Sequence, residues 1–304
     1  MRITVQGVGA VGGFGCGVAA LAQALAQGGA PSFPADPAPL DRFVPKRTQR
    51  RLDRFSRLAV LAAHLALEDA GALGDDPERL AVVVASGYGA TGTTLAMIDS
   101  ILESGDACTS PIHFAGSLHN TPAAHLSILL GAKGPSLTVS QFELSVPSAL
   151  MAAQLWLDQG RVDRVLFGAV DEKSELNDYL WERRAELERP LGPAGAACGE
   201  GAAFFLLSSR DEPASPYCTL DAVSTGRGPA PGQPYPGLVL LDGGADDLPG
   251  RRLTPLWGCM PAAPAFDLAA AALLIRQGAE ERVDCLARTE DGDFGLIRLG
   301  PCRR

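Results

Sequence analysis

The sequence lacks three patterns that mark common functional classes. No two of its seven cysteines form a CxxC pair, so buried reduced thiols are expected, not a zinc site or a disulfide framework. No apolar run reaches the roughly 18 residues needed to span a bilayer. The opening "MRITVQGVGAVGG" lacks the charged and apolar regions of a signal peptide. We therefore expect a cytoplasmic protein with no membrane segment, no bound metal and no cofactor.

Positive charge and histidine are also scarce. The 26 Lys and Arg residues are outnumbered by 35 Asp and Glu residues, and the net charge of −9 argues against a nucleic-acid partner. The four histidines are His64, His113, His119 and His125. The second half of the chain therefore offers no imidazole for acid–base chemistry.

The remaining pattern is that of a layered α/β protein. With 304 residues, 46% of them hydrophobic, the chain is long enough for one or two domains with a large core. Periodicity and glycine stops predict, in order, a strand at 2–8, helices at 16–29 and 50–73, a strand and glycine loop at 79–92, a helix and strand within 121–140, a helix from about 147 to 160, and strands at 161–172 and 199–209. This order predicts a buried sheet covered by helices.

Beyond residue 210 the composition shifts toward proline and glycine. One clear strand is expected at 237–247, followed by a helix at 264–278 and a closing hairpin at 283–300. We therefore predict two α/β halves, residues 1–210 and 211–304, of which the second is shortened.

The glycines of "GVGAVGG" match GxGxxG, which is found in dinucleotide-binding turns. The acidic residue expected about 20 positions later would fall at Pro31–Asp36, inside a proline-rich loop and not at a strand end. The pattern is therefore weak, and nucleotide binding is not expected.

The stretch "TVSQFELSVPSALMAAQLWL" (138–157) predicts a strand, a sharp turn and a helix, an arrangement that often holds a nucleophile. Its tip carries Glu143 between Phe142 and Leu144. One interpretation is structural: the carboxylate caps the amides of the following helix. The other is that it serves as a residual acid or base.

Five stretches in order resemble the β-ketoacyl synthase branch of the thiolase-like superfamily. They are "FVPKRTQRRLDRFSRLAVLAAHLALEDAG", "ASGYGATG", "SPIHFAGSLHNTPAAHLSILLGAKGPSLTVS", "VDRVLFGAVDE" and "GEGAAFFLL". The resemblance implies a thiolase-like fold, two α/β halves in αβαβα layers. Within the branch the chain is most similar to chain-length factors of type II polyketide synthases, especially the short partners of polyene and aryl polyene systems.

That resemblance implies a subunit without catalytic activity. Active members carry Cys at the turn and two His in the second half, whereas this chain has Glu143 at the turn. Asp242 falls near the first His position, and the segment 285–295 replaces the second His motif. The implied partners are a catalytic ketosynthase subunit, in a heterodimer, an acyl carrier protein and the growing acyl chain. Two alternatives stay open: a stand-alone decarboxylase or acyltransferase, and a homodimeric scaffold.

The resemblance also implies which surfaces matter. The heterodimer is expected to form through residues 136–141 and 110–121. Candidates for the acyl tunnel and interface are Met97, Ile112, His113, Phe114 and Leu118. Candidates for docking the carrier or the partner are the basic residues Arg47, Arg50, Arg51 and Arg54, which otherwise form a solvated helix face.

Overall fold

The computed structural model describes residues 3–29, 31–183, 197–209, 216–232, 235–243 and 248–302. Its strands are β1 (Ile3–Gly12), β2 (Gly15–Cys16), β3 (Leu80–Ala85), β4 (Ser136–Val139), β5 (Arg164–Asp171), β6 (Gly201–Ser208), β7 (Cys218–Arg227), β8 (Leu238–Gly243), β9 (Val283–Arg288) and β10 (Asp293–Gly300). Its helices are α1 (Gly17–Gln27), α2 (Lys46–Gln49), α3 (Arg54–Asp69), α4 (Thr91–Ser104), α5 (Pro111–Gly116), α6 (Thr121–Leu130), α7 (Ser145–Asp158), α8 (Glu175–Glu182), α9 (Thr254–Trp257) and α10 (Ala263–Arg276). Three short 3₁₀ turns are η1 (Ala38–Arg42), η2 (Asp106–Cys108) and η3 (Phe142–Leu144).

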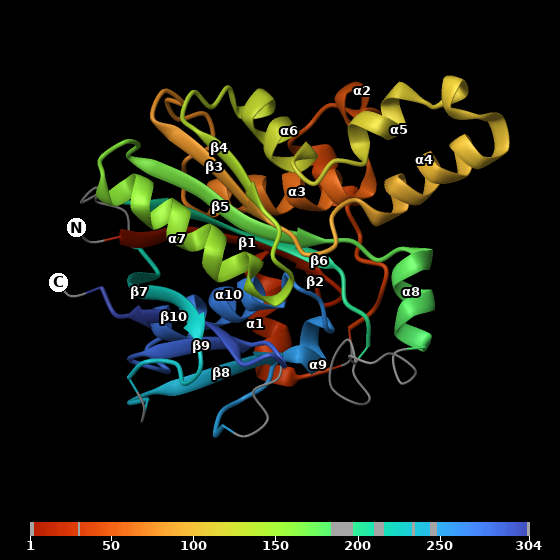
Figure 1. Cartoon of the computed structure of the whole chain (residues 1–304). Helices are drawn as coiled ribbons and strands as arrows, with labels where there is room; N and C mark the ends of the chain where they lie inside the picture. The colour runs from red at the N-terminus through yellow and green to blue at the C-terminus, as the bar shows by residue number, and fades with distance from the viewer. Residues whose placement is uncertain are drawn as a thin grey trace.

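The described strands form one mixed sheet in the order β4-β3-β5-β6-β1-β7-β10-β9-β8, with β2 beside β1. Its two parts meet where β1 pairs with β7 over three residues, Ile3–Val5 against Cys218–Leu220. Helices α7 and α10 contact strands of both parts and lie between them, whereas α3 and α6 cover the other face of the first part (Figure 1). The largest apolar cluster fills the space around α7 and α10, and a second lies beneath α3 and α6.

Glycines in β1 permit close packing of α3. A Cβ atom at Gly7 or Gly9 would clash with the backbone of α3 at Ala66 or Ala62. Strand β1 runs on to Gly12, so the GxGxxG pattern lies within a strand and forms no phosphate-binding turn. The role of these glycines is therefore to let helix α3 pack closely against strand β1.

Most predicted elements are confirmed, with shifted bounds. The helix expected at 50–73 begins at Arg54, because Asp53 caps it by accepting a hydrogen bond from the Ser56 amide at 2.7 Å. Strand β7 was not predicted, since its sequence CTLDAVSTGR lies within the proline- and glycine-rich region. The half boundary at residue 210 stays a prediction, because residues 210–215 are outside the described ranges.

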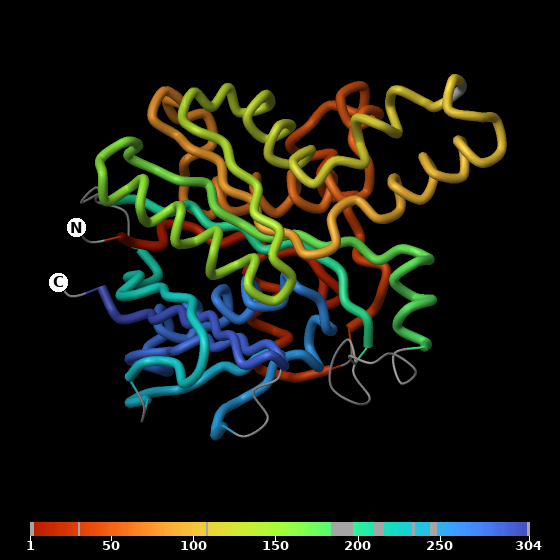
Figure 2. Tube along the Cα trace, viewed as in Figure 1, coloured from red at the N-terminus to blue at the C-terminus, as the bar shows by residue number. Residues whose placement is uncertain are grey.

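The resemblance predicts a fifth, helical layer on the outer face of the second sheet part. In the described part of the chain, the small apolar cluster on that face includes Ala230, and Tyr235 and Leu248 pack against it. All three residues lie outside helices. Figure 2 shows β7–β10 of the second sheet part in cyan to blue, apart from the red to green strands of the first part. No helix in the described ranges is long and apolar enough to cross a membrane.

Candidate functional site

The turn predicted around Glu143 is a 3₁₀ turn, η3, between β4 and α7. Phe142 adopts a φ of +45°, which is a strained conformation for a residue with a side chain. The turn is held from within, since the Gln141 amide donates to the Ser145 Oγ at 2.8 Å. Leu144 is buried beneath it, whereas Glu143 is exposed. The strained residue, Phe142, thus immediately precedes Glu143, which occupies the position expected for a nucleophile.

The interpretation of Glu143 as a helix cap is wrong. Leu144 occupies the N-cap position of α7, and no side chain caps that terminus. Glu143 precedes the cap within the 3₁₀ turn. The turn is closed instead by the Leu144 amide, which donates to the Gln141 carbonyl at 3.0 Å. Glu143 therefore presents its carboxylate at the surface of the turn.

A buried carboxylate holds the turn in place from behind. Ser145 Oγ donates to the Ser86 carbonyl at 3.2 Å, and Ser86 Oγ donates to Asp171 Oδ1 at 2.8 Å. The same oxygen accepts hydrogen bonds from the Gly87 and Tyr88 amides at 3.1 and 2.9 Å. Burial raises the pKa of Asp171 to about 6, against the lowering effect of these donors.

Asp171 also joins the two halves of the chain. Its Oδ2 accepts a hydrogen bond from the Ala262 amide at 2.8 Å, immediately before α10. One side chain at the end of β5 therefore fixes both the loop after β3 and the entry to α10. Sequence reasoning missed this role, although Asp171 lies in the stretch "VDRVLFGAVDE".

Asp242 and Cys259 lie close enough to the turn for the charge of Glu143 to raise the pKa of each. Burial, with a smaller contribution from the charge of Glu143, raises the pKa of Asp242, at the end of β8, to about 6, against the lowering effects of the Gly243 amide and Arg252. Burial, followed by the charges of Asp242 and Glu143, holds the pKa of the Cys259 thiol well above its usual range. Burial and Asp242 also raise the pKa of Asp267 on α10. The structure therefore brings Glu143, Asp242 and Cys259 together, and Cys259 was not predicted.

The segment 285–295, expected near the second His position, also reaches the turn. Strand β9 contacts η3, and Gly295 packs against Leu144 and Pro147. At Gly295 the contact is with the apolar side chains of Leu144 and Pro147, and it supports the turn.

Among the predicted docking residues, Arg54 requires a correction. Its guanidinium donates to Glu200 Oε1 at 2.6 Å and to Glu200 Oε2 at 3.0 Å, and Glu200 is fully buried. The Ala35 and Lys173 amides donate to the same carboxylate. Arg54 therefore neutralises an interior charge and is not available for docking. Arg47, Arg50 and Arg51 are exposed, and none has an ion pair within the described ranges.

The predicted tunnel and interface residues lie on one projecting arm. Helices α4 and α5 pack against each other and extend away from the sheet (Figures 1 and 2). Met97 lies on α4, where its Sδ accepts a hydrogen bond from Ser117 Oγ at 3.7 Å. On and after α5, Ile112 is 75% exposed and Phe114 59%, with Leu118 also exposed. His113 is half-buried, and its Nδ1 has no hydrogen-bond partner among the described residues.

A second apolar surface borders the sheet edge. Strand β4 is the last strand of the first sheet part, and α6 and α7 contact it. Large exposed apolar side chains on these elements and on the turn are Ile128, Phe142, Met151 and Leu155. We call this set the β4 surface.

Known proteins resemble this chain in fold and, at low identity, in sequence. Residues 26–212, more than half of the chain, match the family "Beta-ketoacyl synthase, N-terminal domain". The 3-oxoacyl-[acyl-carrier-protein] synthase 2 of Vibrio cholerae is 26% identical over 175 residues, which cover 57% of this chain and 38% of that protein. The alignments span between 38% and 63% of the length of the first curated relatives.

Two solved structures are similar over 99% of both chains. One belongs to the AntDE:AntF complex, a type II PKS acyl-carrier protein with its ketosynthase bound to the hexaketide, with a TM-score of 0.81 and 19% identity. The other is the ishigamide ketosynthase/chain length factor, with a TM-score of 0.79 and 18% identity. These matches establish a ketosynthase-type, thiolase-like mixed α/β fold. Together with the family match over the first two thirds, they place the chain in the β-ketoacyl synthase family.

Proposed function

We propose that this chain is the non-catalytic, chain-length-factor subunit of a ketosynthase heterodimer. In that role it shapes the acyl tunnel while a polyketide, of the polyene kind, grows on an acyl carrier protein. The observation that carries the proposal is the turn itself, which has the strained geometry of a nucleophile site but presents the Glu143 carboxylate.

The groups around Glu143 do not supply the nucleophile or the anion-stabilising groups that a ketosynthase needs. Acyl transfer needs a thiolate, and the Cys259 thiol is held protonated by burial and by the neighbouring carboxylates. Decarboxylation of an anionic extender unit needs hydrogen-bond donors or cations near the developing charge. Asp242 and Glu143 place two carboxylates there, which disfavour such an anion, and the neighbouring cation Arg252, whose charge lowers the pKa of Asp242, already donates to the Gly243 carbonyl at 3.0 Å. This argues against the stand-alone decarboxylase and acyltransferase alternatives.

The proposed partner is a ketosynthase whose turn retains Cys. The β4 surface combines an unpaired strand edge with exposed apolar side chains, of which Ile128 is 77% exposed. Free strand edges favour aggregation unless another chain covers them. A heterodimer through 136–141 and 110–121 would cover this surface, and obligate interfaces of this kind bury more than about 2,000 Å².

The arm supplies the proposed contact with the growing chain. Met97, Ile112, His113, Phe114 and Leu118 are the proposed wall and interface residues. Arg47, Arg50 and Arg51, without Arg54, remain the proposed docking residues for an acidic carrier protein. The similar structures support this assignment, because one is a ketosynthase with a chain length factor and the other is a ketosynthase with its acyl-carrier protein.

The test is expression of the chain alone and with a Cys-containing ketosynthase subunit. We expect co-expression to raise the soluble yield and to give a tight 1:1 complex that condenses acyl and malonyl thioesters. Alone, the chain should gain no acyl group on the peptide spanning residues 142–145 by mass spectrometry. The Glu143→Cys variant is the positive control for acylation at that peptide. Turnover of malonyl carrier protein by the isolated wild-type chain, or a stable monomer without affinity for any ketosynthase, would refute the proposal.

A further inference from the structure

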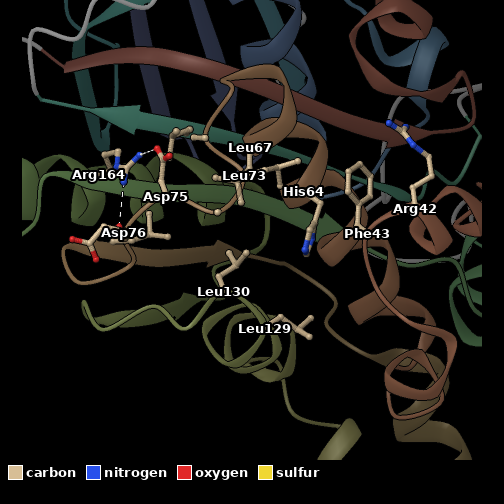
Figure 3. A pocket seen from close by; sticks show the side chains of 14 residues that line it. Arg42, Phe43, His64, Leu67, Leu73, Asp75, Asp76, Leu129, Leu130 and Arg164 are labelled. Carbon is tan, nitrogen blue, oxygen red and sulfur yellow. Dashed lines mark hydrogen bonds and ion pairs between the residues drawn. The ribbon is translucent and has the colours of Figure 1, made fainter.

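A separate cavity of about 360 Å³ lies between α3, α6 and the loop that leads into β3 (Figure 3). None of its lining residues belongs to the turn at Glu143 or to the arm. About half of its wall is apolar, formed by Phe43, Leu67, Leu73, Leu80, Leu129, Leu130 and Leu206, and the charged residues Arg42, Asp75, Asp76 and Arg164 contribute to the remainder. A volume of this size corresponds to that of small-molecule sites.

His64 places one polar atom in this apolar space. The side chain comes from α3, is 8% exposed and points into the cavity (Figure 3). Its Nδ1 lies 2.7 Å from the Val60 carbonyl oxygen. A carbonyl oxygen only accepts, so Nδ1 carries the proton and Nε2 is left as an acceptor. Burial lowers the pKa of His64, which keeps the ring neutral. No described residue donates a hydrogen bond to Nε2.

Three of the four charged side chains that line the cavity form ion pairs, and the fourth, Asp76, accepts a hydrogen bond from the Glu78 amide at 3.0 Å. Asp75 forms an ion pair with Arg164 at 2.5 Å, and Arg42 forms one with Glu68 at 2.6 Å. Arg164 also donates to the Asp76 carbonyl at 3.2 Å. An ionic ligand would have to break these pairs, whereas a neutral one would not.

We propose that this cavity binds a small, neutral, mainly apolar molecule that donates one hydrogen bond to His64 Nε2. The leucines and Phe43 supply apolar contact, and Nε2 selects for a hydroxyl or amide donor. Phenols and alcohols have this chemistry. The site is independent of the proposed subunit function, since it shares no residue with the turn or the arm.

The probe is 4-ethylphenol, and 4-ethylanisole is the matched compound that cannot donate. Titration of the full chain by ligand-observed NMR is expected to show binding of the phenol about three- to tenfold tighter than of the ether. The ¹⁵N resonance of His64 Nε2 should shift with the phenol and not with the ether. Equal affinity for the two compounds, or a silent Nε2 resonance, would overturn the proposal.

Two tryptophan variants locate the site. Leu73 is 44% exposed at the cavity rim, so Leu73→Trp fills the opening without disturbing the core, and it should abolish phenol binding. Leu176 on α8 is 37% exposed and lies outside the cavity, so Leu176→Trp should bind like wild type. Unchanged binding by a folded Leu73→Trp would place the ligand elsewhere. If that variant fails to fold, the wild-type His64 Nε2 resonance locates the site, because only binding in this cavity should shift it.

Discussion

The junction around Asp171 and the α4–α5 arm differ in how many of their polar and apolar side chains find partners within the chain. At the junction a buried carboxylate receives hydrogen bonds from one hydroxyl and three amides. On the arm neither helix has a buried residue, and large apolar side chains face solvent. The junction is therefore complete within one chain. The arm exposes apolar side chains that a partner chain could cover. The turn is therefore held by contacts within the chain, whereas the apolar surface of the arm would need a partner to be buried.

Removing the Asp171 carboxylate should break the junction. Asp171→Ala leaves three buried amides and the Ser86 hydroxyl without their acceptor, at a cost of about 3–5 kcal/mol in the free energy of unfolding. Urea denaturation of the isolated chain measures it. Asp158→Ala, at an exposed site at the end of α7, is the control and should have little effect. Equal stability of the two variants would show that the junction does not hold the turn.

Protonation of Glu172 should make the stability of the protein depend on pH. This residue follows Asp171 and is also buried. Burial raises its pKa to about 7, although the Gly92 amide donates to it at 2.8 Å. The folded state thus holds this proton more tightly than the unfolded state. The contribution of Glu172 to the free energy of unfolding should therefore fall by roughly 2–3 kcal/mol as the pH rises from about 4.5 to 7, in addition to the changes from Asp171 and Asp242.

Glu172→Gln keeps the acceptor for Gly92 but removes the titration. Its stability should vary less with pH over this range than that of wild type, when both are followed by urea denaturation. Glu103→Gln, at an exposed position on α4, should retain the wild-type slope. Parallel curves for wild type and Glu172→Gln would contradict the assignment.

Substitutions on the arm should change product length, not stability. Phe114→Ala and Leu118→Ala should lengthen the products of the reconstituted heterodimer, and Leu118→Trp should shorten them. One two-carbon unit buries about 1.6 kcal/mol of CH₂ groups, so product ratios should change by roughly tenfold. Mass spectrometry of the products measures this, with Leu73→Ala, outside the arm, as the control. Unchanged lengths in all three arm variants would exclude the arm as a tunnel wall.

The smallest effect is expected at Glu143. The side chain is exposed and caps nothing, so Glu143→Gln should alter stability by less than about 0.5 kcal/mol. It should also leave product length unchanged in the heterodimer. If this variant abolished turnover by the heterodimer, the carboxylate would have a chemical role that the proposal denies.

The sequence predicted elements well where local patterns are strong. Apolar runs such as AVVV and FFLL formed the fully buried strands β3 and β6. Strand β7 was missed because only its first three residues are buried and the remainder is mixed. The turn at Glu143 was placed correctly, since a strand, a turn and a helix follow one another within 20 residues.

The contacts that organise the site were beyond sequence reasoning. Asp171 binds amides near residues 87 and 262, and such backbone donors leave no signature in side-chain identity. Arg54 resembled its exposed neighbours Arg50 and Arg51, but its partner Glu200 lies 146 positions away. Cys259 has no local motif at all. In each case the tertiary fold, not the local pattern, determines the role.

The position of β1 in the sheet has a consequence for synthesis. It is synthesised about 200 residues before its neighbours β6 and β7, which begin at Gly201 and Cys218. A nascent chain therefore carries β1 without β6 until residue 208 has left the ribosome, and without β7 until residue 220 has followed. Such delayed, non-local pairing slows folding and prolongs exposure to aggregation. Limited proteolysis of ribosome-bound chains should find β1 cleavable up to that length and protected soon after.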